Sequence, residues 1–440
     1  MKKGNVAALA PIGVFLVLYL GLGILFEYVL KIPKGFYSIP ILVAFLAALL
    51  VACLQNKALS FDEKLEIMGQ GVGDKNIISM ILIFLAAGIF VGVVGRSSAN
   101  SVAYFVLSLI PARFAAVVLF VVSAFVSLSM GTSVGTITLI APIAISISNV
   151  SGFQAPLCIG AVVGGAMFGD NLSFISDTTI AACNGQGCAM KDKFRENFAI
   201  ALPAAIASMV IILISTADHP VAQGIREEYN LIQVIPYVLV LLGGIVGINV
   251  FVVLLIGIAS GSVIMLLTEG IPVIDLLKNM GSGAGSMLET AMVAVLVAAL
   301  CALVRKYGGF EVLLAWTKRF FRGRKAGQLG MGLLVGFMDI ATANNTVAIV
   351  IANPIAKEMA KDYGISPRKS ASILDTFSCI FQGVIPYGAQ MLVAINTAQE
   401  LECHVTAFQI MPYLTYQAML LLSSLVFIFL LPERKNTKTV

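Results

Sequence analysis

Long apolar runs follow one another along almost the whole chain. Valine, isoleucine, leucine, alanine and glycine fill stretches of about 20 residues, the length that an α-helix needs to cross a bilayer core. The runs predict helical spans at residues 6–30, 37–55, 77–95, 113–130, 155–182, 197–216, 231–248, 249–267, 287–304, 328–350, 370–396 and 408–431. Polar residues 56–76 predict an amphipathic surface segment between two spans. The pattern therefore predicts an all-α polytopic membrane protein with about 10–12 transmembrane helices.

The spans that contain Asp170 and Asp375 hold many polar residues and glycines. We therefore expect broken or re-entrant segments there instead of plain lipid-facing helices, because backbone that departs from a helix is tolerated in a membrane where it lines a protein site.

The composition agrees with a membrane protein, since only 12% of the 440 residues are charged whereas soluble domains carry roughly a quarter. The net charge of +5 does not indicate nucleic acid, because the basic residues gather in loops as the positive-inside rule expects. Seven of them lie between Arg305 and Lys325, which predicts a cytoplasmic loop. The remaining basic markers predict another cytoplasmic loop and cytoplasmic termini: Lys191, Lys193 and Arg195, then Lys2 and Lys3, then Arg434, Lys435 and Lys438.

The cysteines and histidines do not predict a metal centre or a cofactor. None of the seven cysteines forms a C-x-x-C pair, and both histidines, His219 and His404, lie in polar loops. Cys183 and Cys188 are close enough in sequence for a disulfide, but a cytoplasmic loop would keep them reduced.

An internal repeat divides the chain. Pro142-Ile143-Ala144 recurs as Pro354-Ile355-Ala356 at an offset of 212 positions (354 − 142), and Gly152 and Gly364 keep that offset. The resulting division is residues 1–58 as N-terminal transmembrane helices, 59–200 as the first repeat, 201–269 as connecting helices, 270–407 as the second repeat and 408–440 as a C-terminal helix and cytoplasmic tail. The loop after the opening helix of the first half, residues 96–113, has few basic residues, whereas its counterpart at 305–325 is strongly basic. Because basic loops stay on the cytoplasmic side, we expect two inverted-topology repeats with a site at their interface.

The first half places two carboxylates and several hydroxyls in an apolar span, from Met167 to Thr179. Asp170, Ser173 and Asp177 share one face of a continuous helix, with the carboxylates about 10 Å apart. One Na⁺ ion can contact both only if the helix breaks between them. The alternative is that the hydroxyls only bond neighbouring helices.

Further candidates follow from the repeat. Thr132 and Ser133 lie in a segment of small and hydroxyl residues, and their counterparts include Asp339, Asn344 and Asn345. Close packing of small residues is the alternative role for both segments. In the second half, Asp375 is the candidate proton carrier, unless it forms a salt bridge with Arg368 or Lys369. Pro386-Tyr387-Gly388 should break the helix that carries Asp375.

These motifs resemble the NhaC family of Na⁺/H⁺ antiporters. The resemblance rests on Gly131-Thr132-Ser133-Val134-Gly135-Thr136 and on Gly169-Asp170-Asn171-Leu172-Ser173-Phe174-Ile175-Ser176-Asp177-Thr178, where the family pattern is close to G-D-x-x-S-P-x-S-D-T and Phe174 replaces the proline. It implies that Asp170 and Asp177 are the paired acidic residues that hold Na⁺, with Asn171, Ser173, Ser176 and Thr178 beside them. It also implies a multi-pass protein of the bacterial inner membrane, with a homodimer as a candidate assembly.

The leading hypothesis is a secondary antiporter that exchanges Na⁺ or Li⁺ for H⁺, with the two cations competing for a carboxylate. The alternative is a Na⁺- or H⁺-coupled carrier of an organic anion or amino acid, held near Asn344 and Tyr387, although cations to hold its carboxylate are lacking at membrane depth. An enzyme is not expected: an intramembrane aspartyl protease needs Gly-x-Gly-Asp, and Met167 breaks that motif before Asp170. No Walker motif occurs either.

Overall fold

The computed structural model describes residues 4–31, 39–174, 176–217 and 229–430. In these ranges the regular structure is helical throughout, which confirms the all-α prediction. Nine helical stretches in the described part of the chain are long and apolar enough to cross a membrane, or ten with the bent stretch near the C-terminus. Lys2, Lys3, Arg434, Lys435, Lys438 and His219 lie outside the described residues.

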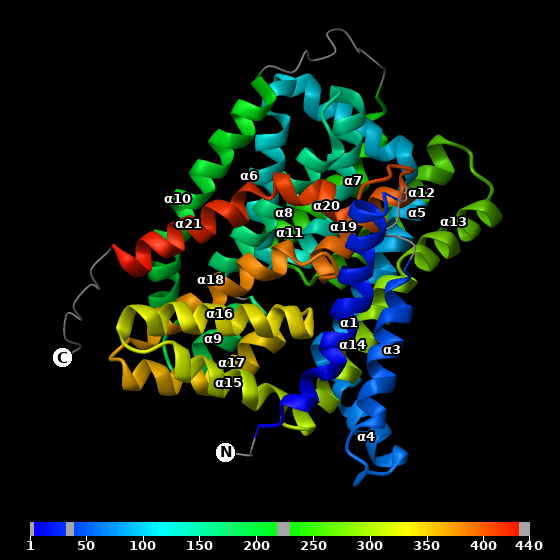
Figure 1. Cartoon of the computed structure of the whole chain (residues 1–440). Coiled ribbons are helices and arrows are strands. Elements are labelled where there is room, and N and C mark those ends of the chain that lie inside the picture. Colours follow the sequence, from blue (N-terminus) through cyan, green and yellow to red (C-terminus); the bar gives the residue numbers. More distant parts are fainter. Residues whose placement is uncertain (1–3, 32–38, 175, 218–228, 431–440) are drawn as a thin grey trace.

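The N-terminal segment lies along the lower half of one side of the molecule in Figure 1, next to α14. Its elements are η1 (Val6–Leu9), α1 (Ala10–Leu16), η2 (Val17–Gly21), α2 (Leu22–Ile24), η3 (Leu25–Val29) and α3 (Ile41–Leu54).

The first half of the repeat begins with a surface helix, as the polar run predicted. The Ser60 hydroxyl and the Glu63 carboxylate cap that helix reciprocally. The elements of this half are α4 (Phe61–Val72), α5 (Lys75–Leu109, kinked at Gly95), η5 (Ala112–Phe114), α6 (Ala115–Met130), α7 (Ser133–Ser151), α8 (Ala155–Leu172) and α9 (Asp177–Gln186).

The second half repeats this order of elements. Both ends of α8 and α18 are separated by the offset seen in the sequence, 212 positions (367 − 155 and 384 − 172). Its elements are α13 (Val273–Ser286), α14 (Leu288–Lys306), α15 (Gly309–Phe320), α16 (Arg324–Thr342), α17 (Asn345–Asp362), α18 (Pro367–Val384) and α19 (Ala389–Glu400). The inverted orientation of the halves stays a prediction.

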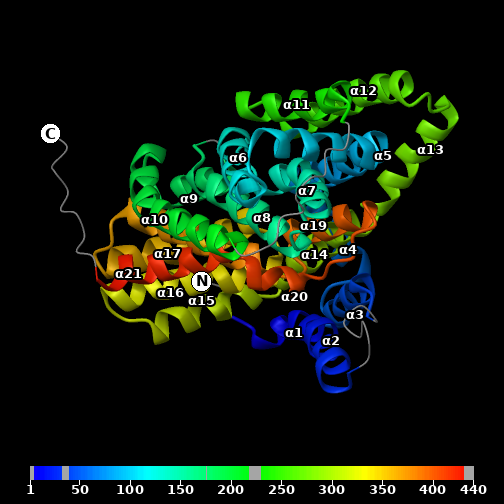
Figure 2. The same cartoon turned by 90° about the horizontal axis from the view of Figure 1, so that it is seen from above.

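The remaining helices connect and cover the two halves. They are α10 (Met190–Ala217), α11 (Leu231–Val246), α12 (Val250–Thr268), α20 (Ala407–Ile410), η6 (Met411–Tyr413) and α21 (Thr415–Phe429). Seen from above, α11 and α12 form one edge of the molecule and the N-terminal helices the opposite edge, with the repeat helices between them (Figure 2).

Three sequence predictions about elements are wrong. No span was predicted over α7, whose hydroxyl residues lower its hydropathy although it is almost entirely buried. The predicted span 328–350 is two helices, because Ala343 adopts a left-handed conformation with φ of 47° and Asn344 caps α17. The predicted basic loop contains helix α15, whose polar face carries part of the charge.

Glycines allow helices to approach closely, both within the first half and between the two halves. A Cβ atom on Gly165 would lie 2.1 Å from the carbonyl oxygen of Phe120, so α8 and α6 pack backbone to backbone. Gly88 and Gly283 permit the same approach between α5 and α13. Small-residue contacts of this kind drive helix association in bilayers.

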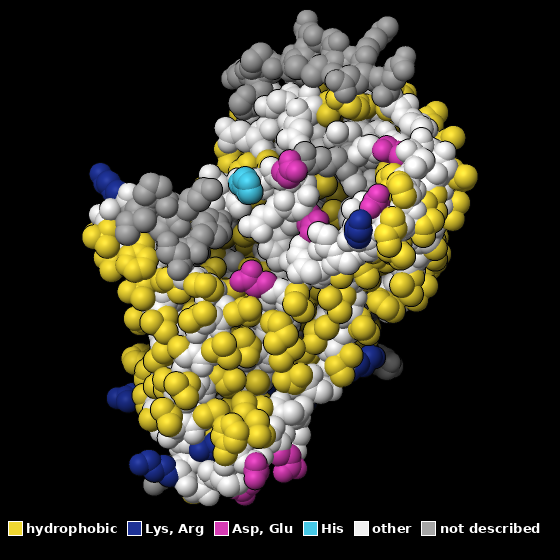
Figure 3. All heavy atoms as spheres, turned by 90° about the vertical axis from the view of Figure 1, so that its right-hand side faces the viewer, with side chains coloured by type: hydrophobic (Ala, Val, Ile, Leu, Met, Phe, Trp, Pro, Cys, Tyr) yellow, Lys and Arg dark blue, Asp and Glu magenta, His cyan; other side chains and the backbone are white. Residues whose placement is uncertain are grey.

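The outer surface fits a lipid environment. Figure 3 shows a broad hydrophobic area over one side of the molecule, with most of the charged side chains above and below it. Exposed apolar side chains on α3, α12 and α13 supply much of this kind of surface, among them Leu46, Leu50, Val263, Val273 and Ile274. The chain is therefore a multi-pass membrane protein.

Candidate functional site

Helix α8 ends in the middle of the first candidate motif. Leu172 is its last residue, and the chain continues in an extended conformation through Ser173, with ψ of 138°. Ser176 then caps α9 by accepting a hydrogen bond from the Thr178 N–H at 3.3 Å. The helix break on which a shared ion would depend is therefore present, although Phe174 stands where the NhaC pattern has proline.

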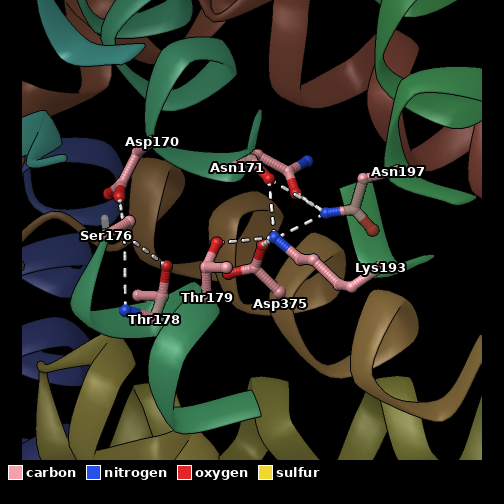
Figure 4. Close-up of polar contacts among 8 residues, drawn as sticks. All are labelled: Asp170, Asn171, Ser176, Thr178, Thr179, Lys193, Asn197 and Asp375. Carbon is pink, nitrogen blue, oxygen red and sulfur yellow. Dashed lines mark hydrogen bonds and ion pairs between the residues drawn. The ribbon is translucent and has the colours of Figure 1, made fainter. Parts of the chain in front are cut away.

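Asp170 lies buried at this break, with 3% of its surface exposed. The Ser133 hydroxyl donates to its carboxylate at 2.6 Å and the Ser133 N–H at 3.3 Å, so the N-terminus of α7 faces the charge. Ser176 also donates to Asp170, and its hydroxyl lies 2.8 Å from that of Thr178 (Figure 4). The carboxylate and three hydroxyls form a compact oxygen-rich cluster.

Asp177 does not join this cluster. It is exposed, and as the first residue of α9 it places negative charge at the positive end of that helix. Ser173 is buried and donates to the Leu128 carbonyl at 2.8 Å, while Thr132 caps α7. Of the two carboxylates expected to hold Na⁺, only Asp170 therefore lies inside the cluster, together with the predicted hydroxyls of Ser133, Ser176 and Thr178.

A buried lysine forms the second part of the site, which the sequence analysis missed. Lys193 is 1% exposed and forms an ion pair with Asp375, which is fully buried. Its ammonium group also donates to the Asn171 carbonyl and to the Thr179 hydroxyl, each at 2.7 Å. Asn197, one turn further along α10, donates to Asn171 and to Asp375 (Figure 4).

This arrangement corrects three predictions. Lys193 does not mark a loop, because α10 begins at Met190 and carries it into the interior. Asp375 pairs with Lys193 and not with Arg368 or Lys369, and Arg368 pairs instead with Glu196 at 2.9 Å. A cation is thus present at the depth where none was expected. The spacing of Lys193 and Asn197 by four residues at the start of an apolar helix was the available signal.

Hydrogen bonds connect the second half to Asp170. The Gln390 amide donates to the Ser133 hydroxyl at 3.1 Å, and Gln382 donates to Gln390 at 2.9 Å and to the Ala343 carbonyl at 3.0 Å. The break between α16 and α17 therefore connects to the Asp170 cluster through two glutamines. The sequence analysis did not predict this path.

The other second-half candidates lie around this path. Asp339 is fully buried and accepts from Ser378 at 3.5 Å. Asn344 caps α17 by accepting from the Val347 N–H, and Asn345 accepts from Thr346. A break at 385–388 separates α18 from α19, as Pro386-Tyr387-Gly388 predicted.

The two halves place different chemistry at equivalent positions. At an offset of 212, Asp170 corresponds to Gln382 (382 − 170), Ser176 to Gly388 and Asp177 to Ala389. An amide, a glycine and an alanine therefore stand in the second half where the first half has a carboxylate, a hydroxyl and a second carboxylate.

Together, the helix breaks, the buried carboxylates and the apolar exterior are those of a membrane transporter. The model of the Na⁺/H⁺ antiporter family matches residues 6–217 and 227–429. The chain belongs to the Na⁺/H⁺ antiporter family, which contains transporters and not enzymes.

Three curated relatives and one solved structure show the range of similarity. An uncharacterized protein of Haemophilus influenzae is 36% identical over 102 residues, 23% of this chain and 20% of the relative. The malate-2H⁺/Na⁺-lactate antiporter of Bacillus subtilis is 25% identical over 195 residues, 44% of this chain and 41% of the relative. An uncharacterized Na⁺/H⁺ antiporter of Haemophilus influenzae is 21% identical over 363 residues, 72% of this chain and 77% of the relative.

The first two matches thus span less than half of each relative. The YdaH transporter of Alcanivorax borkumensis has a similar structure with a TM-score of 0.41 and 15% identity, covering 84% of this chain and 88% of the other.

Proposed function

We propose that this protein exchanges Na⁺, with Li⁺ as an alternative cargo, for H⁺ across a bacterial inner membrane, and that Asp170 is the carboxylate for which the two cations compete. The buried cluster of Asp170 with Ser133, Ser176 and Thr178 carries the proposal. Carboxylate and hydroxyl oxygens are hard ligands that suit an alkali cation. The extended backbone after Leu172 adds carbonyl oxygens that no longer serve a helix.

Asp170 is a better candidate than the other carboxylates. Asp375 already has a cationic partner in Lys193, so a Na⁺ ion there would have to displace an ammonium group. Asp177 is exposed and stands outside the cluster. Competition at one carboxylate couples the two fluxes, because Na⁺ binds the ionised form and H⁺ removes that form.

The test is exchange in proteoliposomes with an internal pH dye. Wild type should move protons on addition of NaCl or LiCl, and Asp170→Asn should not, because the amide keeps the size of the side chain and loses its charge. Asp192→Asn, at a partly exposed position in the first turn of α10, serves as the matched control. Wild-type vesicles that respond to neither cation between about pH 6.5 and 9, where a perturbed carboxylate titrates, would refute the proposal.

An organic acid carried with an ion is the second candidate function. The Bacillus subtilis relative is named for exchange of malate and lactate. A cavity beside Asn344 favours this candidate.

A further inference from the structure

A large cavity lies between α4 and α5 of the first half and the helices of the second half, apart from the Asp170 cluster. Its volume is about 590 Å³, within the range of about 300–1,000 Å³ typical of small-molecule sites. Mostly apolar side chains of α5 and α14 line much of the cavity. The buried end of the cavity lies at the helix breaks before α17 and α19. A Na⁺ ion does not need so much apolar space.

The buried end of the cavity offers hydrogen-bond donors. Asn344 is 8% exposed, and its amide nitrogen has the Met80 sulfur, a weak acceptor, at 3.4 Å. Ala389, the first residue of α19, also lines the cavity. No side chain caps this helix, because its N-cap is Gly388. An uncapped helix N-terminus presents free N–H groups and a positive dipole end.

A comparison of the two halves indicates which sign of charge the buried end of the cavity favours. In the first half, Ser176 caps α9 and Asp177 neutralises its N-terminus. Gly388 and Ala389 stand at these positions in the second half, so the dipole of α19 remains uncompensated. The first break therefore suits a cation and the second suits an anion.

The exposed end of the cavity has both signs of charge. Arg305 and Lys306 are exposed there with Asp74, and Glu311 is partly exposed. Their formal charges cancel, so the exposed end favours neither sign of charge in a ligand. The buried end therefore determines whether the cavity binds an anion or a cation.

From this geometry we infer that the cavity is a second binding site, for a small organic acid whose carboxylate lies between the Asn344 amide and the N-terminus of α19 and whose carbon chain lies against α5 and α14. The inference rests on the second candidate function above and assigns its site. It is independent of Na⁺ binding at Asp170.

The experiment measures binding of the potassium salts of L-lactate and L-malate to the full-length protein in detergent by isothermal titration calorimetry. Asn344→Asp replaces the donor with a negative charge and keeps a favoured N-cap, so α17 should still form. We expect it to weaken binding at least ~tenfold, because a donor to a charged group is lost and a repulsive charge is gained. Ala389→Asp copies the first half and should weaken binding similarly. Asn149→Asp, exposed on α7, is the matched control and should bind as wild type.

Three results overturn the inference: neither acid binds wild type, both variants bind as well as wild type, or Asn149→Asp weakens binding as much as they do. Na⁺/H⁺ exchange is measured separately, in vesicles with chloride as the sole anion. If wild type binds the acids but shows no Na⁺/H⁺ exchange, the proposed exchange function alone is refuted. If wild type exchanges Na⁺ for H⁺ but binds neither acid, this inference alone is refuted.

Discussion

The buried ion pair between Lys193 and Asp375 makes a quantitative prediction about stability. Both side chains are shielded from water, with 1% and 0% exposure. Removing one partner of a buried pair leaves an uncompensated charge and costs about 3–5 kcal/mol. Lys193→Met should therefore destabilise the protein by an amount in this range.

The remaining contacts predict that the two single variants differ. Without Lys193, the Asp375 carboxylate keeps one donor, Asn197 at 3.2 Å. Without a charged Asp375, the Lys193 ammonium still donates to Asn171 and Thr179. Asp375→Asn should thus cost less than Lys193→Met. The double variant should cost about 2–3 kcal/mol less than the sum, because neither charge is then orphaned.

The assay is denaturant unfolding in mild detergent, followed by circular dichroism. The more exposed pair of Lys318 and Glu358 supplies the control. The corresponding variants there, Lys318→Met and Glu358→Gln, should each cost under about 1 kcal/mol. The reasoning is refuted if Lys193→Met costs no more than Lys318→Met, or if the losses at the buried pair are simply additive.

Two further predictions concern packing and pH. Gly165→Ala should destabilise the protein by about 1–3 kcal/mol through overpacking, because the new Cβ atom meets the Phe120 carbonyl, whereas Gly13→Ala has open space; equal melting temperatures for the two variants would contradict this. At the start of α4, outside the membrane, hydrogen bonds from Ser60 lower the pKa of Glu63. The stability that Glu63 contributes is therefore present above its ordinary pKa and lost as pH falls through the lowered value. Glu63→Gln should flatten the acid side of the melting-temperature profile against pH, and an unchanged profile would refute the role of the cap.

The sequence predicted features that depend on local pattern. The length of the apolar runs predicted the membrane helices, because a segment in hydrocarbon must hydrogen-bond its backbone groups within itself. The paired Pro-Ile-Ala motifs gave the offset that the helices follow, and the polar residues around Asp170 gave the break after Leu172. Where hydroxyls diluted the pattern, as over α7, the prediction failed.

Partnerships between distant residues were decided by the tertiary structure. Lys193 appeared to mark a loop because its neighbours are polar, yet the packing of α10 against α18 brings it to Asp375, 182 positions along the chain (375 − 193). The separation of Asp170 from Asp177 also depends on how α9 leaves the break, which spacing on an ideal helix does not determine. The sequence by itself determined the membrane class, the repeat and the chemistry available at each break. Only the fold decided which charges meet, because burying a charge is tolerated where another element supplies its partner.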